Sequence, residues 1–109
     1  MALKRGDIVT ITPAGDFNKP RPAVVLQNFS PAGMETVTIV PLTSDLKRLP
    51  SIRVPVAPTP QNGLRTPSEI MTDNVQTILR RRIGQIIGHL EEDVVQLMAE
   101  SVGVFLGLR

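Results

Sequence analysis

The chain of 109 residues contains no cysteine, no tryptophan, no tyrosine and a single histidine. Without cysteine there is no disulfide framework, no thiolate nucleophile and no thiolate metal site, and this composition is typical of proteins of a reducing cytoplasm. With one histidine, a single chain cannot build a zinc centre from several imidazoles. We therefore expect a cytoplasmic protein that has no resident metal and no cofactor.

Long apolar runs are also missing. No run approaches the roughly 20 residues that a membrane helix needs. Charge from Lys4 onwards interrupts the segment where a signal peptide would have its apolar core. We therefore expect no membrane partner. The hydrophobic fraction of 41% is too high for an intrinsically disordered chain, and the length predicts a single domain over residues 1–109.

Aromatic side chains are scarce, because only three phenylalanines are present. This disfavours a protein that binds single strands by stacking bases on a row of rings. Twelve Lys and Arg against ten Asp and Glu, with a sequence pI near 9.7, permit a polyanionic partner without requiring one. The densest basic cluster is Arg80–Arg82, for which we favour a solvated charge run over a phosphate-contacting rim.

The first half of the chain predicts short strands separated by turn residues. Alternation and β-branched residues predict the first strand, and an almost wholly apolar run predicts a second strand that is covered on both faces. Proline, glycine and asparagine mark the segments 13–20, 28–33 and 57–67 as loops or turns. The expected strands cover residues 7–12, 22–26, 36–42, 51–56 and 68–72.

The last part of the chain has helical periodicity. Glu91, Glu92 and Asp93 place negative charge where a helix N-terminus is stabilised by it. An apolar stripe with spacings of three and four residues follows, made of Val94, Val95, Met98, Val102, Phe105 and Leu106. The isoleucines between residues 83 and 87 fit a strand or a short helix equally well.

Many short strands followed by one terminal helix predict a mainly β fold of the α+β class. We expect a small, strongly curved sheet or SH3-like partial barrel of mostly antiparallel strands, with the C-terminal helix packed on it. The sequence lacks the G-x-S-x-G elbow, the phosphate-binding loop with its lysine, and the H-E-x-x-H motif. The lone His89 precedes the expected helix, and we interpret it as a structural or surface residue.

Four segments stand out in order along the chain, and each carries charged or hydroxyl residues at a strand end. They are Lys4-Arg5-Gly6-Asp7-Ile8-Val9, Arg21-Pro22-Ala23-Val24-Val25-Leu26-Gln27-Asn28, Val40-Pro41-Leu42-Thr43-Ser44 and Thr72-Asp73-Asn74-Val75-Gln76-Thr77-Ile78. Together they resemble the PemK/MazF family of toxin endoribonucleases, in which similar motifs occur in the same order. The stretch Ile83-Gly84-Gln85-Ile86 and the closing helix are similar to that family too, so the resemblance covers nearly the whole chain.

The resemblance implies metal-independent cleavage of single-stranded RNA, with the ribose 2′-OH attacking the adjacent phosphorus. It assigns the family's catalytic arginine to Arg21 and its catalytic threonine to Thr43. Arginine matches phosphate oxygens bidentately, and a threonine hydroxyl donates to a phosphoryl oxygen. Since a guanidinium does not readily deprotonate, we expect Arg21 to act as an electrostatic clamp and possible acid rather than as a base.

The resemblance also implies residues that bind the RNA. Asp73 occupies the family's acidic position, and Asp16 and Phe17 are the counterparts of an acid and a contact residue in a first loop that is shorter here. Ser44, Gln76 and Arg80 complete this set. The chain departs from the family pattern at Gln76 and Met71, where members carry arginine.

Plainer interpretations stand beside these roles. Arg21 also fits a solvated strand entrance, Thr43 a turn residue that caps the next segment, and Asp73 a turn former. Phe17 fits a hydrophobic plug over the barrel mouth as well as a base-stacking ring.

The resemblance further implies a toxin–antitoxin pair: a homodimeric toxin whose partners are RNA and an acidic, partly disordered antitoxin segment. Two alternatives belong to other classes of protein. One is a non-catalytic relative that poisons DNA gyrase, as the CcdB branch does, although such a binder needs neither Arg21 nor Thr43. The other is a KOW-type RNA-binding barrel, which Gly6-Asp7-Ile8-Val9 and Gly15 echo, but which leaves the terminal helix unexplained.

Overall fold

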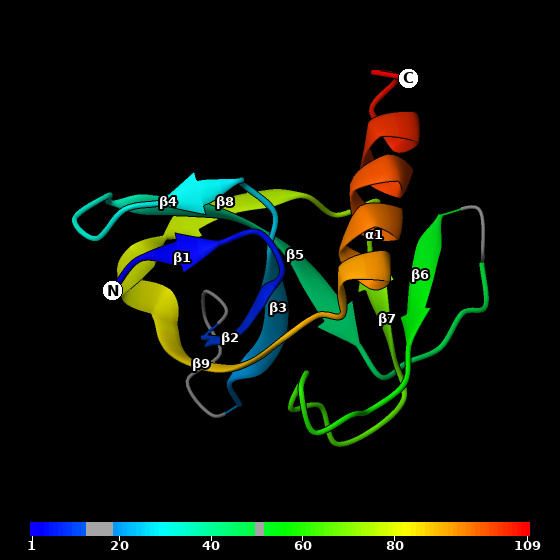
Figure 1. Cartoon of the computed structure of the whole chain (residues 1–109), viewed down its shortest axis with the longest axis horizontal. Helices are drawn as coiled ribbons and strands as arrows, with labels where there is room; N and C mark the ends of the chain where they lie inside the picture. Colours follow the sequence, from blue (N-terminus) through cyan, green and yellow to red (C-terminus); the bar gives the residue numbers. More distant parts are fainter. Residues whose placement is uncertain (13–18, 50–51) are drawn as a thin grey trace.

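The computed structural model describes residues 1–12, 19–49 and 52–109. Nine strands, a short 3-10 helix (η1) and one α-helix follow one another along these residues (Figure 1). None of the helices in these ranges is long and apolar enough to cross a membrane. The elements are β1 (Leu3–Lys4), β2 (Asp7–Ile11), β3 (Arg21–Val25), β4 (Phe29–Ser30), β5 (Thr36–Thr43), β6 (Arg53–Val56), β7 (Ser68–Met71), β8 (Gln76–Leu79), η1 (Arg80–Arg82), β9 (Ile83–His89) and α1 (Glu92–Phe105).

Seven of the strands form one curved sheet in the order β6-β7-β5-β3-β2-β9, with β8 paired to β5. Every strand pairing in the described ranges is antiparallel, and β1 and β4 form a separate two-stranded ribbon. The short 3-10 helix η1 leads from β8 into β9. Because β9 pairs with β2 at the other end of the sheet, the strands curl into a partial barrel. The expected mainly β fold with antiparallel strands and a C-terminal helix is confirmed.

The core lies on both faces of the central strands. Ile8, Val24 and Val40 stand in register on one face and join α1 in one apolar cluster. Val25 and Ile39 pair on the other face and belong to a second cluster inside the barrel. Alternate residues of a strand point to opposite faces, so a nearly continuous apolar run is what this two-sided burial requires. The strand predicted at residues 22–26 is covered on both faces as expected.

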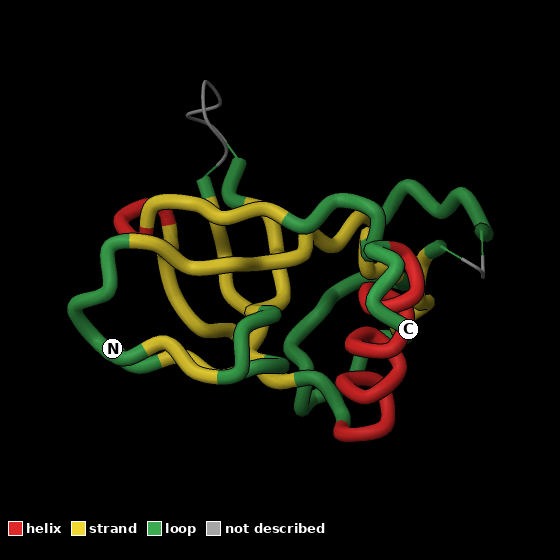
Figure 2. Tube along the Cα trace, turned by 90° about the horizontal axis from the view of Figure 1, so that it is seen from above, coloured by secondary structure: helices red, strands yellow, loops and turns green. Residues whose placement is uncertain are grey.

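The helix α1 stands beside the curved strands and packs on β6 (Figure 2). Met98 and Val102 are buried in the cluster between helix and sheet, with Val94 and Val95 packed at its edge. Glu91 stands at the N-cap position of the helix and two acidic residues occupy its first turn, which confirms the predicted N-terminus.

Phe105 and Leu106, at the end of the predicted apolar stripe, are each 51% exposed. The C-terminal end of α1 projects past the strands (Figure 1).

The structure also corrects the expected strand pattern. Phe29 and Ser30 lie in the predicted turn 28–33 but pair with β1, and β8 was not expected as a strand. Residues 83–89, which fitted a strand or a helix, form β9. The register between β2 and β9 is irregular, and such irregularities interrupt the alternation of inward and outward side chains. This is why the sequence of β9 shows no regular alternation of apolar and polar residues.

The long loop of residues 57–67 is organised by one buried amide. Asn62 is fully buried, and its Oδ1 accepts hydrogen bonds from the backbone N–H groups of Thr59 and Leu64, each at 3.0 Å. Its Nδ2 donates to the carbonyl of Ala57 at 2.9 Å. The loop also meets β9 directly, since the His89 N–H donates to the carbonyl of Gln61. These bonds give a loop rich in proline a fixed position against the barrel.

The same loop is tied to the start of α1 through Glu91. The Thr59 hydroxyl donates to the Glu91 carboxylate at 2.7 Å, and Asn62 Nδ2 lies 3.4 Å from its other oxygen. The Thr59 hydrogen bond, followed by the backbone N–H of Glu91 itself, lowers the pKa of the Glu91 carboxyl below its ordinary value. Asn62 and His89 act in the same direction, and partial desolvation opposes them.

Two glycines with left-handed backbones make a matched test of the contact between this loop and β9. A Cβ at Gly63 (φ +70°) would collide with the backbone carbonyl of Ile87, whereas a Cβ at Gly33 (φ +96°) would meet nothing within 4 Å. Both substitutions to alanine introduce the same kind of backbone strain. We expect Gly63→Ala to lower the free energy of unfolding by about 1–3 kcal/mol more than Gly33→Ala does, measured by urea denaturation. Equal losses would show that the loop does not press on β9.

The Glu91 interaction predicts a specific pH dependence of stability. Because the folded-state pKa of Glu91 lies below that of the unfolded chain, the carboxylate stabilises the fold above the ordinary glutamate pKa. This contribution is lost as the pH falls through the lowered value. Glu91→Gln should therefore be less stable than the wild type at pH 7, and the difference should shrink in acid. Denaturation of both proteins across pH 3–7 measures it, and in a Thr59→Val background the difference should be smaller at every pH. Parallel curves for the two proteins would contradict this assignment.

Candidate active site

Arg21 and Thr43 line one cleft of about 480 Å³. Arg21 is the first residue of β3 and Thr43 is the last residue of β5, so both stand where a rigid strand meets a loop. These two strands pair antiparallel with Val24 opposite Val40. The pairing ends at Ala23 opposite Pro41, two residues from Arg21 in β3 and two residues from Thr43 in β5, so both residues lie at the same end of this strand pair.

The Thr43 hydroxyl is oriented by the turn that follows it. Its Oγ1 accepts a hydrogen bond from the Asp45 N–H at 3.0 Å, so the hydroxyl keeps its own proton for donation. The next part of the turn is fixed by Glu69, a buried residue of β7 that pairs with Thr43 of β5. Its carboxylate accepts the backbone N–H groups of Lys47 and Arg48, each at 3.0 Å. The turn-capping role and a role in binding a ligand are therefore compatible at Thr43.

The rest of the cleft comes from β2, β9 and the loop 57–67. From the loop come Gly63, Leu64, Arg65 and Thr66, and from β9 come Gln85 and Ile87. Among the described residues that line the cleft, the charged ones are Arg21 and Arg65, with no carboxylate. Hydroxyls of Thr10, Thr43 and Ser44 add polar groups. A cleft with two guanidinium groups and several hydroxyls fits an anionic ligand.

Ser44 is the third predicted site residue that the structure places in this cleft. Arg65 and Gln85 were not predicted, because the segment 57–67 signalled only a loop and the strand β9 was ambiguous. The sole signal for Arg65 was its position two residues after the Asn62-Gly63 turn.

Three other predicted site residues lie elsewhere. Asp73 lies two residues beyond the end of β7 and does not line the cleft. Its Oδ1 lies 3.4 Å from Arg53 Nε in an ion pair, and neither atom has a hydrogen-bond partner among the described residues. Gln76 begins β8 opposite Ile39, and its Nε2 donates to Asn74 Oδ1 at 3.0 Å.

Arg80 is held by the N-terminal ribbon. Its Nη1 donates to the Ser30 hydroxyl at 2.6 Å, and its Nη2 donates to the carbonyl of Met1. It lines a separate cavity that it shares with Arg81. Asp16 and Phe17, the two predicted contacts of the first loop, lie outside the described residues.

His89 stands outside the cleft. Its Nδ1 lies 3.0 Å from Asp7 Oδ1, and Asp7 Oδ2 accepts the Lys4 N–H at 3.0 Å. The imidazole therefore links β9 to the N-terminal turn, in keeping with the structural interpretation. In residues 1–12, 19–49 and 52–109, no group of three or more acidic or histidine side chains is placed to hold a metal ion.

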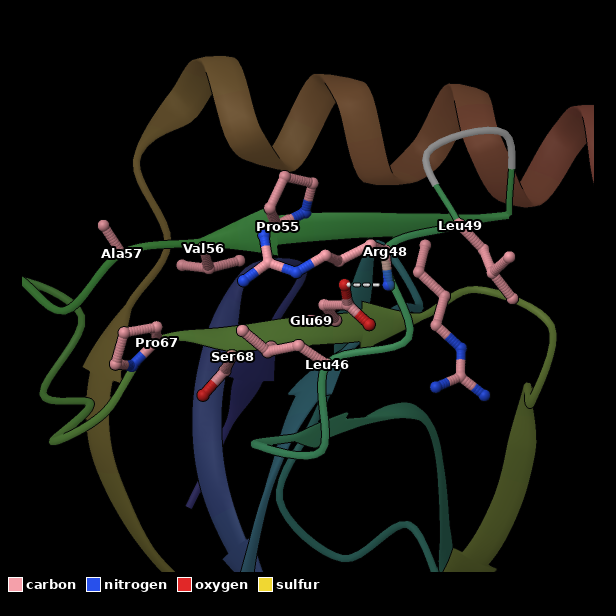
Figure 3. Close-up of a pocket in the computed structure, with 10 residues that line it drawn as sticks. Leu46, Arg48, Leu49, Pro55, Val56, Ala57, Pro67, Ser68 and Glu69 are labelled. Atoms are coloured by element: carbon pink, nitrogen blue, oxygen red, sulfur yellow. Dashed lines mark hydrogen bonds between the residues drawn. The ribbon is translucent and has the colours of Figure 1, made fainter.

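A second cavity of about 710 Å³ opens between the segment 46–49 and the strands β6 and β7 (Figure 3). Its lining is largely apolar, with Leu46, Leu49, Pro55 and Pro67 around the buried Glu69. The dashed line in Figure 3 marks the hydrogen bond from the Arg48 N–H to Glu69. None of the sequence-predicted site residues that the structure describes lines this cavity.

Comparison with known proteins identifies the family. A family model described as the PemK-like, MazF-like toxin of type II toxin–antitoxin systems matches residues 4–106. A protein named probable endoribonuclease MazF from Mycolicibacterium smegmatis is 35% identical over 107 residues, which cover 97% of this chain and 98% of that protein. Endoribonuclease MazF3 of Mycobacterium tuberculosis is 33% identical over 88 residues, which cover 80% of this chain and 82% of that protein.

Solved structures agree in fold. The Mycobacterium tuberculosis toxin MazF-mt6 superimposes with a TM-score of 0.76 at 29% sequence identity, over 94% of this chain and 98% of that one. A MazE–MazF structure from Deinococcus radiodurans, at 20% identity, shares the fold over the full length of both chains with a TM-score of 0.77. The family match, the two sequence relatives and the shared architecture lead to one conclusion: this chain belongs to the PemK/MazF-like family of type II toxin–antitoxin toxins.

Proposed function

We propose that the protein is an endoribonuclease toxin that cleaves single-stranded RNA at the Arg21–Thr43 cleft without a metal ion. The observation that carries the proposal is the convergence of these two residues, which are 22 positions apart in the sequence, in one cleft that also holds Arg65. Family membership and two relatives named endoribonucleases support the same activity.

Arg21 stabilises the charge that develops on the phosphoryl oxygens. A guanidinium carries a positive charge and can bind two of these oxygens at once. Its position at the entrance of β3 fixes the backbone of the residue, while the side chain remains exposed to the substrate. Charge stabilisation of this kind contributes the most when the donors are already in place before the reaction.

Thr43 donates a hydrogen bond to a phosphoryl oxygen. The Asp45 N–H occupies a lone pair of the hydroxyl oxygen, so the hydroxyl proton is available for donation to a ligand. Ser44, on the same turn, adds a second hydroxyl to the cleft and is a proposed substrate contact. Asp73, Gln76 and Arg80 lie outside the cleft, so any contact that they make with RNA involves nucleotides beyond the cleaved bond.

The reaction needs no nucleophile from the protein. The ribose 2′-oxygen forms a bond to the adjacent phosphorus and loses its proton, while the bond from phosphorus to the 5′-oxygen breaks and that oxygen takes up a proton. The products are a 2′,3′-cyclic phosphate and a 5′-hydroxyl. Arg21 and Thr43 bind the phosphoryl oxygens in the transition state, in which the negative charge on these oxygens is greatest.

We also propose the biological setting that the family suggests. The toxin acts in the cytoplasm and is inhibited by a cognate antitoxin with an acidic segment. It forms a homodimer, and the exposed apolar side chains of α1 support this assembly: Leu97, Val104 and Phe105 are 48%, 63% and 51% exposed.

Cleavage of a long single-stranded RNA in the presence of EDTA tests the proposed activity. The wild type should cut, and Arg21→Ala and Thr43→Ala should each lower kcat/KM by about 10²- to 10³-fold, since each removes one stabiliser of the transition-state charge. Thr43→Ser keeps the hydroxyl and should retain most of the activity.

Arg81→Ala is the matched control, because it removes an exposed arginine that lines a different cavity. Circular dichroism and the Tm of each variant establish that it is folded. A folded wild type that leaves RNA intact, or alanine variants that cut as fast as the wild type, would refute the proposal.

A further inference from the structure

We propose that Arg65 is a positioning residue that binds a backbone phosphate of the RNA next to the cleaved one. This inference rests on the proposed function, because it adds a contact within the same cleft. Arg65 lies far from Arg21 and Thr43 in the sequence and comes from a different element, the loop 57–67.

The backbone around Arg65 is held in place before any ligand binds. Asn62, three residues earlier, is fully buried and fixes the loop through four hydrogen bonds of its side-chain amide. Gly63 packs against the backbone of Ile87, so the loop cannot approach β9 more closely. Ser68, three residues later, is already part of β7. An arginine on so short an anchored segment projects from a fixed point, which reduces the entropy lost on binding.

The chemistry of the side chain specifies the ligand class. Arg65 is exposed, and it forms no ion pair with any residue of the described ranges. No carboxylate is found among the described residues of the cleft. A guanidinium held over such a cleft attracts an anion, and phosphate oxygens match its geometry.

The division of labour between the two arginines follows from their surroundings. Arg21 and Thr43 lie at the same end of the β3–β5 pair and line the same cleft. In the proposed function these two groups bind the phosphate at which the reaction occurs. A strand of RNA carries a phosphate at each nucleotide, so a strand held there presents the neighbouring phosphate to the rest of the cleft. Arg65 is the second described cation that lines it. Contacts of this type position the strand and do not read its sequence.

The salt dependence of RNA binding tests this role independently of cleavage. The probe is a fluorescently labelled, fully 2′-O-methylated single-stranded RNA of mixed sequence, which lacks the attacking hydroxyl. For single strands, each phosphate contact contributes about 0.7 to the slope of log K against log salt concentration. Arg65→Ala should reduce the slope measured by fluorescence anisotropy by about 0.7 and weaken binding roughly 10-fold at low salt.

Two further variants separate a phosphate contact from a general loss of charge. Arg81→Ala removes the same charge at a different cavity and should leave the slope unchanged. Arg65→Lys keeps one positive charge and should restore the slope, while binding more weakly than the wild type because a lysine cannot bind bidentately. With cleavable RNA, Arg65→Ala should raise KM and change kcat little, in contrast to Arg21→Ala.

The outcomes distinguish this inference from the proposed function. An unchanged slope for Arg65→Ala, or an equal reduction for Arg81→Ala, overturns the assignment even if the wild type cleaves RNA. A fall in kcat as large as that of Arg21→Ala also overturns it, because Arg65 would then act on the reacting phosphate. If the wild type binds the probe with the expected slopes but cuts no RNA, the positioning contact stands and the endoribonuclease proposal fails.

Discussion

The hydrogen bonding of strand β5 to three different strands is the constraint on which the rest of the structure depends. Residues 39–41 pair with β3 along one edge, while residues 36–39 pair with β8 and residues 42–43 pair with β7 along the other. The first half of β5 is therefore part of the barrel, and its end belongs to the part of the sheet that lies next to α1. Val37 and Ile39 belong to one apolar cluster and Val40 and Leu42 to the other, so a shift by one residue would move each of these side chains to the opposite face of the strand. Thr43 ends this strand, and its position follows from the register of the strand.

A second scaffold, the loop 57–67, completes the cleft. Asn62 satisfies the backbone groups of the loop from within, and Thr59 and Asn62 bind Glu91 at the cap of α1. The loop, β9 and the helix are thus joined around one buried amide, and an unsatisfied amide at such a site is costly. A single guanidinium from each scaffold reaches the cleft: Arg21 from the sheet and Arg65 from the loop. In the function that we propose, Arg21 holds the reacting phosphate and Arg65 holds the neighbouring part of the strand.

The sequence predicted the fold class, most strands and the helix. The family resemblance pointed to Arg21 and Thr43, which the structure brings into one cleft. The alternation of apolar and polar residues, the acidic residues at the start of the helix and the order of the motifs are all patterns among residues close together in the chain. Such patterns can be recognised in a single sequence. The remainder depends on long-range geometry. Nothing in the sequence shows that the C-terminal end of α1 projects past the strands (Figure 1) or that Phe105 is exposed. Likewise, Arg80 looked available in a basic run, but it bonds to Ser30 and Met1 across the fold. The sequence did not single out Arg65, because a proline-rich loop gives no sign of a fixed position. That the loop is fixed follows only from the burial and hydrogen bonds of Asn62 in the structure.

The chemical identity of the ends produced by cleavage tests the central claim most directly. Attack by the ribose 2′-oxygen, with Arg21 and Thr43 stabilising the phosphoryl group, leaves a 5′-hydroxyl on one fragment and a 2′,3′-cyclic phosphate, or the 3′-phosphate formed by its opening, on the other. Mass spectrometry of the fragments from a metal-free digest reads both ends. We expect these two termini, and no cutting where a 2′-deoxy nucleotide replaces the one that attacks. Fragments with a 5′-phosphate and a 3′-hydroxyl would contradict the account, because a water molecule and not the RNA itself would then be the nucleophile.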